Sequence, residues 1–341
     1  MEQWAILYEL AVELWELQPW RRMYDTNVFG VQHPKTGQIG YCCVLGRMGE
    51  FFGLACYIGP EGLWALHRAF TRPSEPRREV VPWINGVVLN YAEKSRLQPE
   101  DLGVIRRLGL DLRGQKRWPE FRSYRPHYWP WFLSKGDAVF FAPVLEQAIR
   151  VGELFERDET CVPSWGPGSL IPVRVPKTHG GTIQWEWGWV EQKRVDPSTI
   201  LKRKEVNPFL LRKVELTARR IESVWEMDYV HSPDPFREND ERPYFARLFM
   251  CIDATVDQIV GQELLKANQD VSELAGFLLK KFDELGAYPS HIVVKRADTA
   301  AAMKPIAKAL KIHLRRSKNL AAFDHAMKGL LFFLSRNRNK P

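Results

Sequence analysis

Apolar and polar residues recur with two different periods along the chain, and each change of period marks an expected element. Residues 3–17 carry apolar side chains at helical spacing, and Pro19 ends this helix. Residues 27–59 predict three strands separated by glycine-containing turns. Residues 59–70 then predict a second helix, with a proline near its start. An α-β-β-β-α unit therefore occupies about the first 70 residues.

The middle of the chain is less regular. The segment 71–82 has the composition of a connector, and residues 101–112 predict a helix or helical turn. An aromatic, proline-rich and arginine-rich loop is expected over 116–137, followed by an amphipathic helix over 138–155. Residues 169–195 predict a hairpin. Trp185, Trp187 and Trp189 occupy every second position, which places them on one face of a strand.

The last third alternates strands and helices in a clear order. Strands are expected at 223–233, 243–253, 257–265, 290–296 and 311–316, and helices at 270–286, 298–310 and 320–336. The order is β-β-β-α-β-α-β-α. A helix-length connection returns the chain in the same direction, so the later strands run parallel to one another.

These elements predict an α+β protein in two parts. The first part is an aromatic-rich α/β region over 1–200, with 1–70 and 83–195 as candidate subdomains. Residues 201–222 are polar and contain a linker or connecting helix, and 223–341 form a mixed-sheet domain.

Particular stretches of the sequence resemble those of two protein families. The order of elements over 223–334, with "WEMD" at 225–228 and "YPSHIVVKRAD" at 288–298, resembles the ribonuclease H-like core of retroviral-integrase-like transposases. The chain as a whole also resembles an uncharacterised bacterial family built of two domains of unknown function. That second resemblance rests on "GYCCVLGRMGEFFGLACYIGPEGL", "WPEFRSYRPHYWPW" and "ERPYFARLFMCID", and it implies no activity.

The transposase resemblance implies three carboxylates around two metal ions, Mg or Mn. Asp228 matches the first acid, while Asp298 and Asp324 are the available candidates for the others. Arg296 stands where the second acid is expected, and an arginine there repels a cation. The alternative interpretations place Asp228 on the exposed face of a strand, or bonded to the loop 234–240, and place Asp298 at the N-cap of a helix.

Composition narrows the classes of function. The five cysteines show no C-x-x-C spacing and the eight histidines are scattered, so no metal site is expected and the thiols are reduced in a cytoplasmic protein. No apolar run is long enough to span a bilayer, so a membrane is not an expected partner. From Gly286 onward the chain has 12 Lys and Arg against 2 Asp and Glu. Such a basic end is typical of a nucleic-acid footprint, or of a solubilising tail.

Two basic stretches are candidate contacts for nucleic acid. The aromatic loop offers arginines for phosphates and rings for stacking, and the end of the basic region offers exposed cations. The candidate residues are Arg117, Arg122, Arg125, Trp129, Arg315, Arg316 and Lys318. The same loop is also compatible with arginines stacked on tryptophans over a core.

The sequence thus favours a non-catalytic interaction protein that binds nucleic acid through its basic C-terminal domain, without a cofactor. The alternative is a nuclease or strand-transferase that uses Asp228, Asp298 and Asp324 with Mg or Mn. A third hypothesis is a module that binds only a protein partner.

Overall fold

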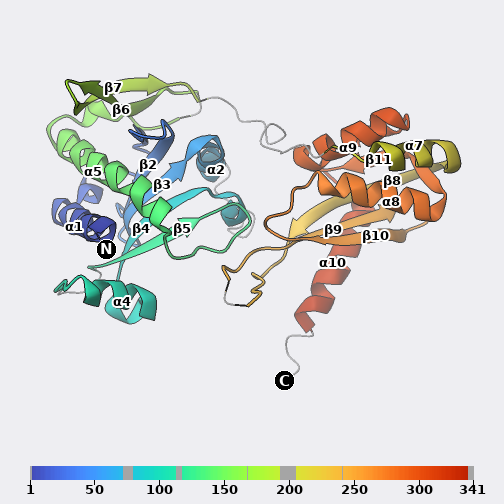
Figure 1. The fold of residues 1–341 in the computed structure, drawn as a ribbon, viewed down its shortest axis with the longest axis horizontal. Helices are drawn as coiled ribbons and strands as arrows, with labels where there is room; N and C mark the ends of the chain where they lie inside the picture. The colour runs from blue at the N-terminus through green and yellow to red at the C-terminus, as the bar shows by residue number, and fades with distance from the viewer. Residues whose placement is uncertain are drawn as a thin grey trace. The chain divides into compact units, whose positions relative to one another are not determined.

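The chain folds into two compact units, Met1–Val195 and Asp196–Pro341. The computed structural model describes residues 2–71, 80–112, 117–166, 168–192, 205–239 and 241–336. Each unit has a mixed β-sheet with helices packed on it (Figure 1). This arrangement confirms the predicted α+β class. Among the described helices, none has both the length and the apolar surface to cross a membrane.

The first unit has a seven-stranded sheet in the order β5-β4-β3-β2-β1-β6-β7. Its strands are β1 (Phe29–Gln32), β2 (Ile39–Leu45), β3 (Phe52–Ile58), β4 (Gly86–Ala92), β5 (Trp118–Tyr124), β6 (Ile171–His179) and β7 (Thr182–Val190). β1 pairs in parallel with β6, and the other neighbouring strands are antiparallel.

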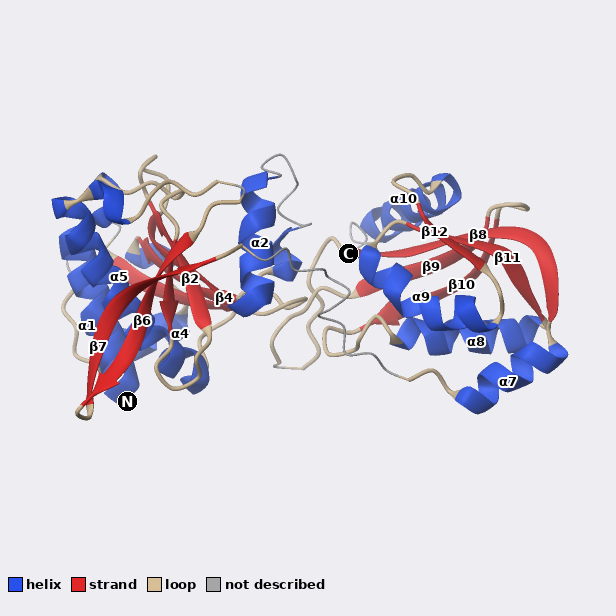
Figure 2. Ribbon diagram, turned by 90° about the horizontal axis from the view of Figure 1, so that it is seen from above, coloured by secondary structure: helices blue, strands red, loops and turns tan. Residues whose placement is uncertain are grey.

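Helices cover both faces of this sheet (Figure 2). They are α1 (Glu2–Leu17), α2 (Gly59–Thr71), α4 (Pro99–Arg107) and α5 (Lys135–Arg157). Alternation along β2 explains the two faces, because successive side chains point to opposite sides. Cys42 and Val44 join the core beneath α1 and α5, whereas Tyr41 and Cys43 pack with residues of α2.

The predicted α-β-β-β-α start and the hairpin of β6 and β7 are confirmed. Two strands of the same sheet were not predicted. β4 follows the connector, and β5 occupies the first part of the segment 116–137 that was expected to be a loop. A loop was expected because prolines and arginines outnumber aliphatic residues in this segment. The expectation was wrong for β5 because this strand lies at the edge of the sheet, where proline is tolerated.

The second unit has a five-stranded sheet in the order β10-β9-β8-β11-β12. Its elements are α7 (Pro208–Thr217), β8 (Arg219–His231), β9 (Arg247–Asp253), β10 (Gln258–Leu265), α8 (Glu273–Leu285), β11 (Ala287–Val294), α9 (Ala297–Ala309), β12 (His313–Arg316) and α10 (Ala321–Arg336). β8, β11 and β12 run parallel, and β9 is antiparallel to its two neighbours. The predicted order of strands and helices is present.

The central strand β8 buries both of its faces. Trp225, Met227 and Tyr229 are at most 2% exposed, and the Trp225 ring lies 5.5 Å from that of Phe282 on α8. The opposite face carries Val224 and Val230, which pack with residues of α10. The segment 201–222, where a linker or connecting helix was expected, contains α7, and β8 begins at Arg219, four residues before the predicted start of the strand at 223.

Candidate functional site

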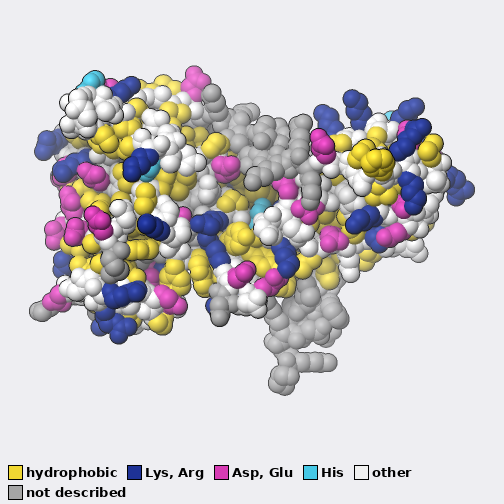
Figure 3. Space-filling model, in the orientation of Figure 1, with side chains coloured by type: hydrophobic (Ala, Val, Ile, Leu, Met, Phe, Trp, Pro, Cys, Tyr) yellow, Lys and Arg dark blue, Asp and Glu magenta, His cyan; other side chains and the backbone are white. Residues whose placement is uncertain are grey.

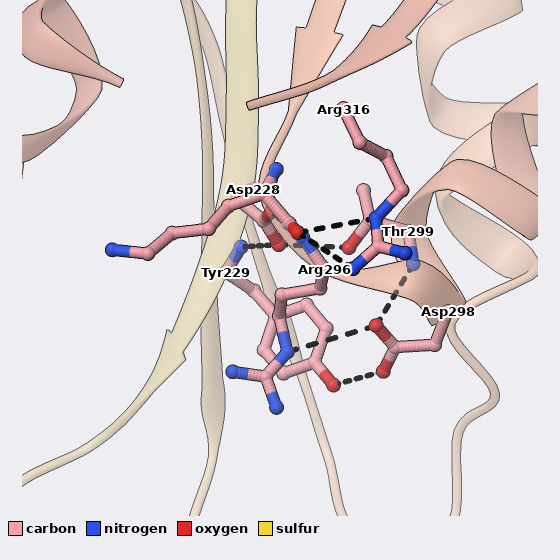
Figure 4. Close-up of polar contacts among 7 residues, drawn as sticks. Asp228, Tyr229, Arg296, Asp298, Thr299 and Arg316 are labelled. Carbon is pink, nitrogen blue, oxygen red and sulfur yellow. Dashed lines mark hydrogen bonds and ion pairs between the residues drawn. The ribbon is translucent and has the colours of Figure 1, made fainter. Parts of the chain in front are cut away.

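A buried polar cluster lies where β8 passes the end of β11 and the start of α9 (Figure 4). Parallel strands bring their carboxyl ends to one edge of a sheet, which is where polar side chains of different segments meet. Asp228 stands on β8 and is 1% exposed, so the interpretation of an exposed strand residue was wrong. Asp228 lies on the same face of β8 as Val224 and Val230, and its carboxylate is covered by the turn after β11 and by Thr299 of α9.

The Asp228 carboxylate is fully used as an acceptor within the fold. Its Oδ2 accepts hydrogen bonds from the backbone amides of Lys295 at 2.7 Å and Arg296 at 2.8 Å. Its Oδ1 accepts from the Thr299 hydroxyl at 2.8 Å and from the Tyr229 amide at 2.9 Å. A carboxylate offers about four acceptor positions, so these four donors occupy them all.

Burial raises the pKa of Asp228 above its ordinary value of 3.8. The hydrogen bond from the Arg296 amide and the charge of its guanidinium act in the opposite direction, and the Thr299 hydroxyl adds to them. The burial effect is the larger of these. Ionised Asp228 therefore costs folding free energy, and the donors around it offset only part of that cost.

Asp298 lies beside Asp228 in the first turn of α9 and is 5% exposed. Its Oδ2 accepts from the Tyr229 hydroxyl, and its Oδ1 lies 3.6 Å from the Arg296 Nε. Burial raises the pKa of Tyr229, so the phenol keeps the proton that it donates. The predicted N-cap role of Asp298 was wrong, since α9 begins one residue earlier and Arg296 occupies the N-cap position.

Two guanidinium groups balance the two carboxylates. The Arg296 Cζ lies 4.5 Å and the Arg247 Cζ 5.9 Å from the centroid of the Tyr229 ring. Arg247 is 2% exposed and donates to the backbone oxygen of Lys266 at 2.9 Å. Sequence reasoning missed Arg247, Tyr229 and Thr299, because the residues of the cluster lie on three separate segments, β8, β9 and α9, and no motif connects these segments.

Asp324, the third candidate acid, is half-buried on α10. At the start of that helix the Phe323 amide donates to the Glu226 carboxylate at 3.1 Å. Glu226 lies on the same face of β8 as Asp228, so this face holds both junctions, one to α9 and one to α10. Across the residues that the structure describes, no three acidic, histidine or cysteine side chains come close enough to hold a metal ion.

The buried cluster does not fit the two metal ions that the transposase resemblance implies. A divalent cation needs free carboxylate oxygens, and those of Asp228 are taken by backbone amides and a hydroxyl. The Arg296 guanidinium lies beside Asp298, and its charge repels a metal ion at that position. The donor set is that of a structural ion-pair cluster.

A groove with cationic walls lies on the surface of the same unit, between α9 and β12. It has a volume of about 570 Å³. We call it the cation groove, and its lining is Ala297, Ala300, Ala301, Lys304, Ala307, Lys308, Ile312, Leu314, Arg315 and Arg316. In Figure 3, lysine and arginine side chains follow the upper edge of this unit, where Figure 1 places α9.

The cation groove contains two of the predicted nucleic-acid contacts, Arg315 and Arg316, and Lys318 is exposed just beyond β12. Arg316 also donates to the Lys295 backbone oxygen from Nε at 3.4 Å and Nη2 at 3.3 Å. Lys304 and Lys308 were not predicted. Their spacing of four residues on an expected helix was the signal, because it places both on one face.

The candidate residues of the first unit lie in β5 and close to its two ends. Arg122 is inside the fold, where it forms two 2.8 Å hydrogen bonds with Asp101 and a third with Glu120. Its guanidinium also covers the Phe132 ring, at 4.9 Å. An arginine held in this way has few donors left for a phosphate.

The other three candidates of the first unit are closer to the surface. Arg117 lies 3.9 Å from Glu16, and Arg125 lies 3.6 Å from Asp137. Trp129 is 43% exposed. Their role in nucleic-acid binding stays a prediction.

The fold and the cluster define an α+β protein of two units, in which the second unit has a charge-balanced buried cluster and a cationic surface groove. The chain matches two sequence families, each described as a domain of unknown function: DUF7309 over residues 4–171 and DUF6930 over residues 210–331. Together these matches fit an uncharacterised two-domain family. No curated protein matches the chain.

Among solved structures, the chain is similar to one in the cryo-EM structure of the simian T-cell lymphotropic virus intasome in complex with PP2A regulatory subunit B56 gamma. The identity is 19% and the TM-score 0.26, over 41% of this chain and 48% of that chain. The chain therefore spans about half the length of the viral-complex chain. A TM-score of this size carries no argument about fold or function.

The Asp228→Asn variant tests whether the Asp228 carboxylate stabilises the junction of β8, β11 and α9, a role that we call a structural brace. The amide group of asparagine has one acceptor oxygen, so it faces at least two of the four donors with a donor of its own. We expect the opening free energy of β8 and β11 to fall by about 2 to 4 kcal/mol. Hydrogen exchange of peptides from 219–231 and 287–296 measures it, and the exposed Asp257→Asn is the isosteric control. Unchanged protection in Asp228→Asn would contradict the brace.

The raised pKa of Asp228 predicts a pH dependence of stability. A folded-state pKa above the unfolded value gives a contribution that is fully present below the ordinary pKa of 3.8 and is lost as the pH rises through the folded-state pKa. The stability difference between the wild type and Asp228→Asn should therefore shrink from pH 4 towards neutral pH. The same hydrogen-exchange measurement, corrected for intrinsic rates, checks this. A difference that grows with pH would mean that the hydrogen bonds outweigh the cost of burial.

Proposed function

We propose that the second unit is a ribonuclease H-like domain that binds nucleic acid through the cation groove, without metal-dependent catalysis. The sheet order β10-β9-β8-β11-β12, with three antiparallel strands followed by parallel ones, supports the comparison with that fold class. Fold class alone says little about activity, so the proposal depends on the surface and on the cluster.

The cation groove is the observation that carries the proposal. From Lys295 to Lys318 the chain has eight Lys and Arg residues and one acidic residue, Asp298, which is buried in the cluster. No acidic side chain lines the groove among the residues that the structure describes. A surface of one charge, with cations on two neighbouring elements, attracts a polyanion and gains free energy from the release of its counterions.

The buried cluster supports binding without catalysis. Asp228 and Asp298 come together through Thr299, which donates its hydroxyl to the first and its amide to the second. This proximity is the one observation that favours the alternative, a metal-dependent nuclease or strand-transferase. Against it, both carboxylates already have partners with which they form a neutral group.

Reversal of two groove charges tests the proposal. Lys304→Glu/Lys308→Glu should weaken binding of a fluorescent oligonucleotide and make the slope of log K against log salt shallower by about 1.4 for a single strand. Anisotropy at several salt concentrations measures both quantities. The matched control is Lys280→Glu/Lys328→Glu, which reverses two exposed lysines on other helices. Equal losses in both variants, or no binding by the wild type, would contradict the proposal.

Divalent metal separates the two functions. We expect affinity for the oligonucleotide to be the same in chelator and in Mg²⁺ at matched ionic strength, with no cleavage in Mg²⁺ or Mn²⁺. Gel analysis of the labelled strand detects cleavage. Cleavage that Asp228→Asn abolishes while the variant still binds would establish the nuclease alternative and overturn the non-catalytic proposal.

A further inference from the structure

The cation groove differs from a uniformly basic patch because both of the elements that flank it, α9 and β12, supply cations and apolar side chains to its lining. Ala297, Ala300 and Ala301 of α9 and Leu314 of β12 supply its apolar lining, which we call the floor. Lys304 and Lys308 are exposed on the helix side, and Arg315 is exposed on the strand side. A ligand that fits this groove has negative charge along its length and apolar surface between its charges.

We infer that the cation groove takes a single strand of nucleic acid rather than a duplex, an inference that rests on the proposed function. A duplex presents phosphates on its outside and keeps its base faces stacked within, so it has little apolar surface to place on the alanine floor. A single strand exposes sugars and base faces as well as phosphates. It can therefore contact the floor and both walls at once.

The spacing of the cations agrees with one strand lying along α9. Lys304 and Lys308 are one helical turn apart, about 6 Å along the axis. Arg316 is held near the start of α9 by its hydrogen bonds to the Lys295 backbone oxygen, and this contact still leaves guanidinium donors for an anion. The cations thus extend from the beginning of the helix to its last turn.

The lining also predicts how weakly the groove distinguishes sequences. No aromatic side chain lines it in the described part of the chain, so it has no stacking platform. Small aliphatic residues supply the floor, and lysine and arginine bind backbone phosphates whatever the base sequence of the strand. Binding should depend on the charge and single-strandedness of the ligand and should vary little with base composition.

Three probes of about 20 nucleotides test this inference by anisotropy at one low salt concentration: a poly-dT strand, a duplex, and an abasic strand with the charge of the first. We expect the poly-dT strand to bind about tenfold more tightly than the duplex and about tenfold more tightly than the abasic strand. Lys304→Glu/Lys308→Glu should lose most of the poly-dT affinity. Lys304→Gln/Lys308→Gln should lose less, and it guards against a folding defect in the double glutamate variant.

The outcomes separate this inference from the proposed function. A duplex that binds as well as poly-dT, with loss in the groove variants, overturns the single-strand inference and leaves the proposed function standing. An abasic strand that binds as tightly as poly-dT also overturns the inference, because the floor then contributes nothing. If an acidic peptide binds and neither strand nor duplex does, both proposals are overturned and the groove binds a protein.

Discussion

The contact between the Asp228 carboxylate and the two amides after β11 holds the second unit in its present form. A parallel strand pair such as β8 and β11 has no turn of its own to fix where the second strand ends and the next helix begins. Asp228 supplies that fixed point, because one oxygen binds the amides of Lys295 and Arg296 and the other binds the Thr299 hydroxyl on α9. The direction in which α9 leaves the sheet depends on this carboxylate, and so does the wall of the groove that α9 forms with β12.

This dependence links the buried cluster to the surface. Arg296 is the second residue after β11, and the bond from its amide to Asp228 holds the backbone from which its guanidinium reaches Asp298 and the Tyr229 ring. Arg316 reaches the same turn from β12 through the Lys295 backbone oxygen. The acids that a metal-dependent enzyme would use are therefore used to position a helix whose outer face carries Lys304 and Lys308.

Much of this fold could be predicted from the sequence, and the reason differs between elements. α8 begins near Ser272 and ends at Gly286, whose φ of +58° is a left-handed conformation that glycine adopts without strain. The apolar run of β9 and the turn at Asp253 were also predicted from the sequence. The Asp253 carboxylate accepts a hydrogen bond from the Thr255 amide at 2.9 Å in this turn. Such elements are specified by neighbours in the chain.

The elements and contacts that were not predicted are specified by residues far away in the sequence. β5 is a strand because it pairs with β4, and the proline and charged residues in its sequence mask that preference. Asp228 and Asp298 could be chosen as candidates from the chain, but their partners could not, because the amides of Lys295 and Arg296 carry no side-chain signal. The same holds for Arg122, whose pairing with the buried Asp101 spans 21 residues and uses donors that the sequence alone leaves open for a phosphate.

Arg296 shows how one residue can change the chemistry of a site without changing its architecture. A divalent cation and a guanidinium both neutralise carboxylates, but the guanidinium is covalently fixed, keeps its charge at every accessible pH and has no open coordination position for water. The buried Arg247 and the half-buried Arg296 balance the charge of two buried aspartates within the cluster. The exposed lysines and arginines of α9 and β12 lie outside this cluster, so the salt dependence of phosphate binding in the groove would be set by them and not by the cluster.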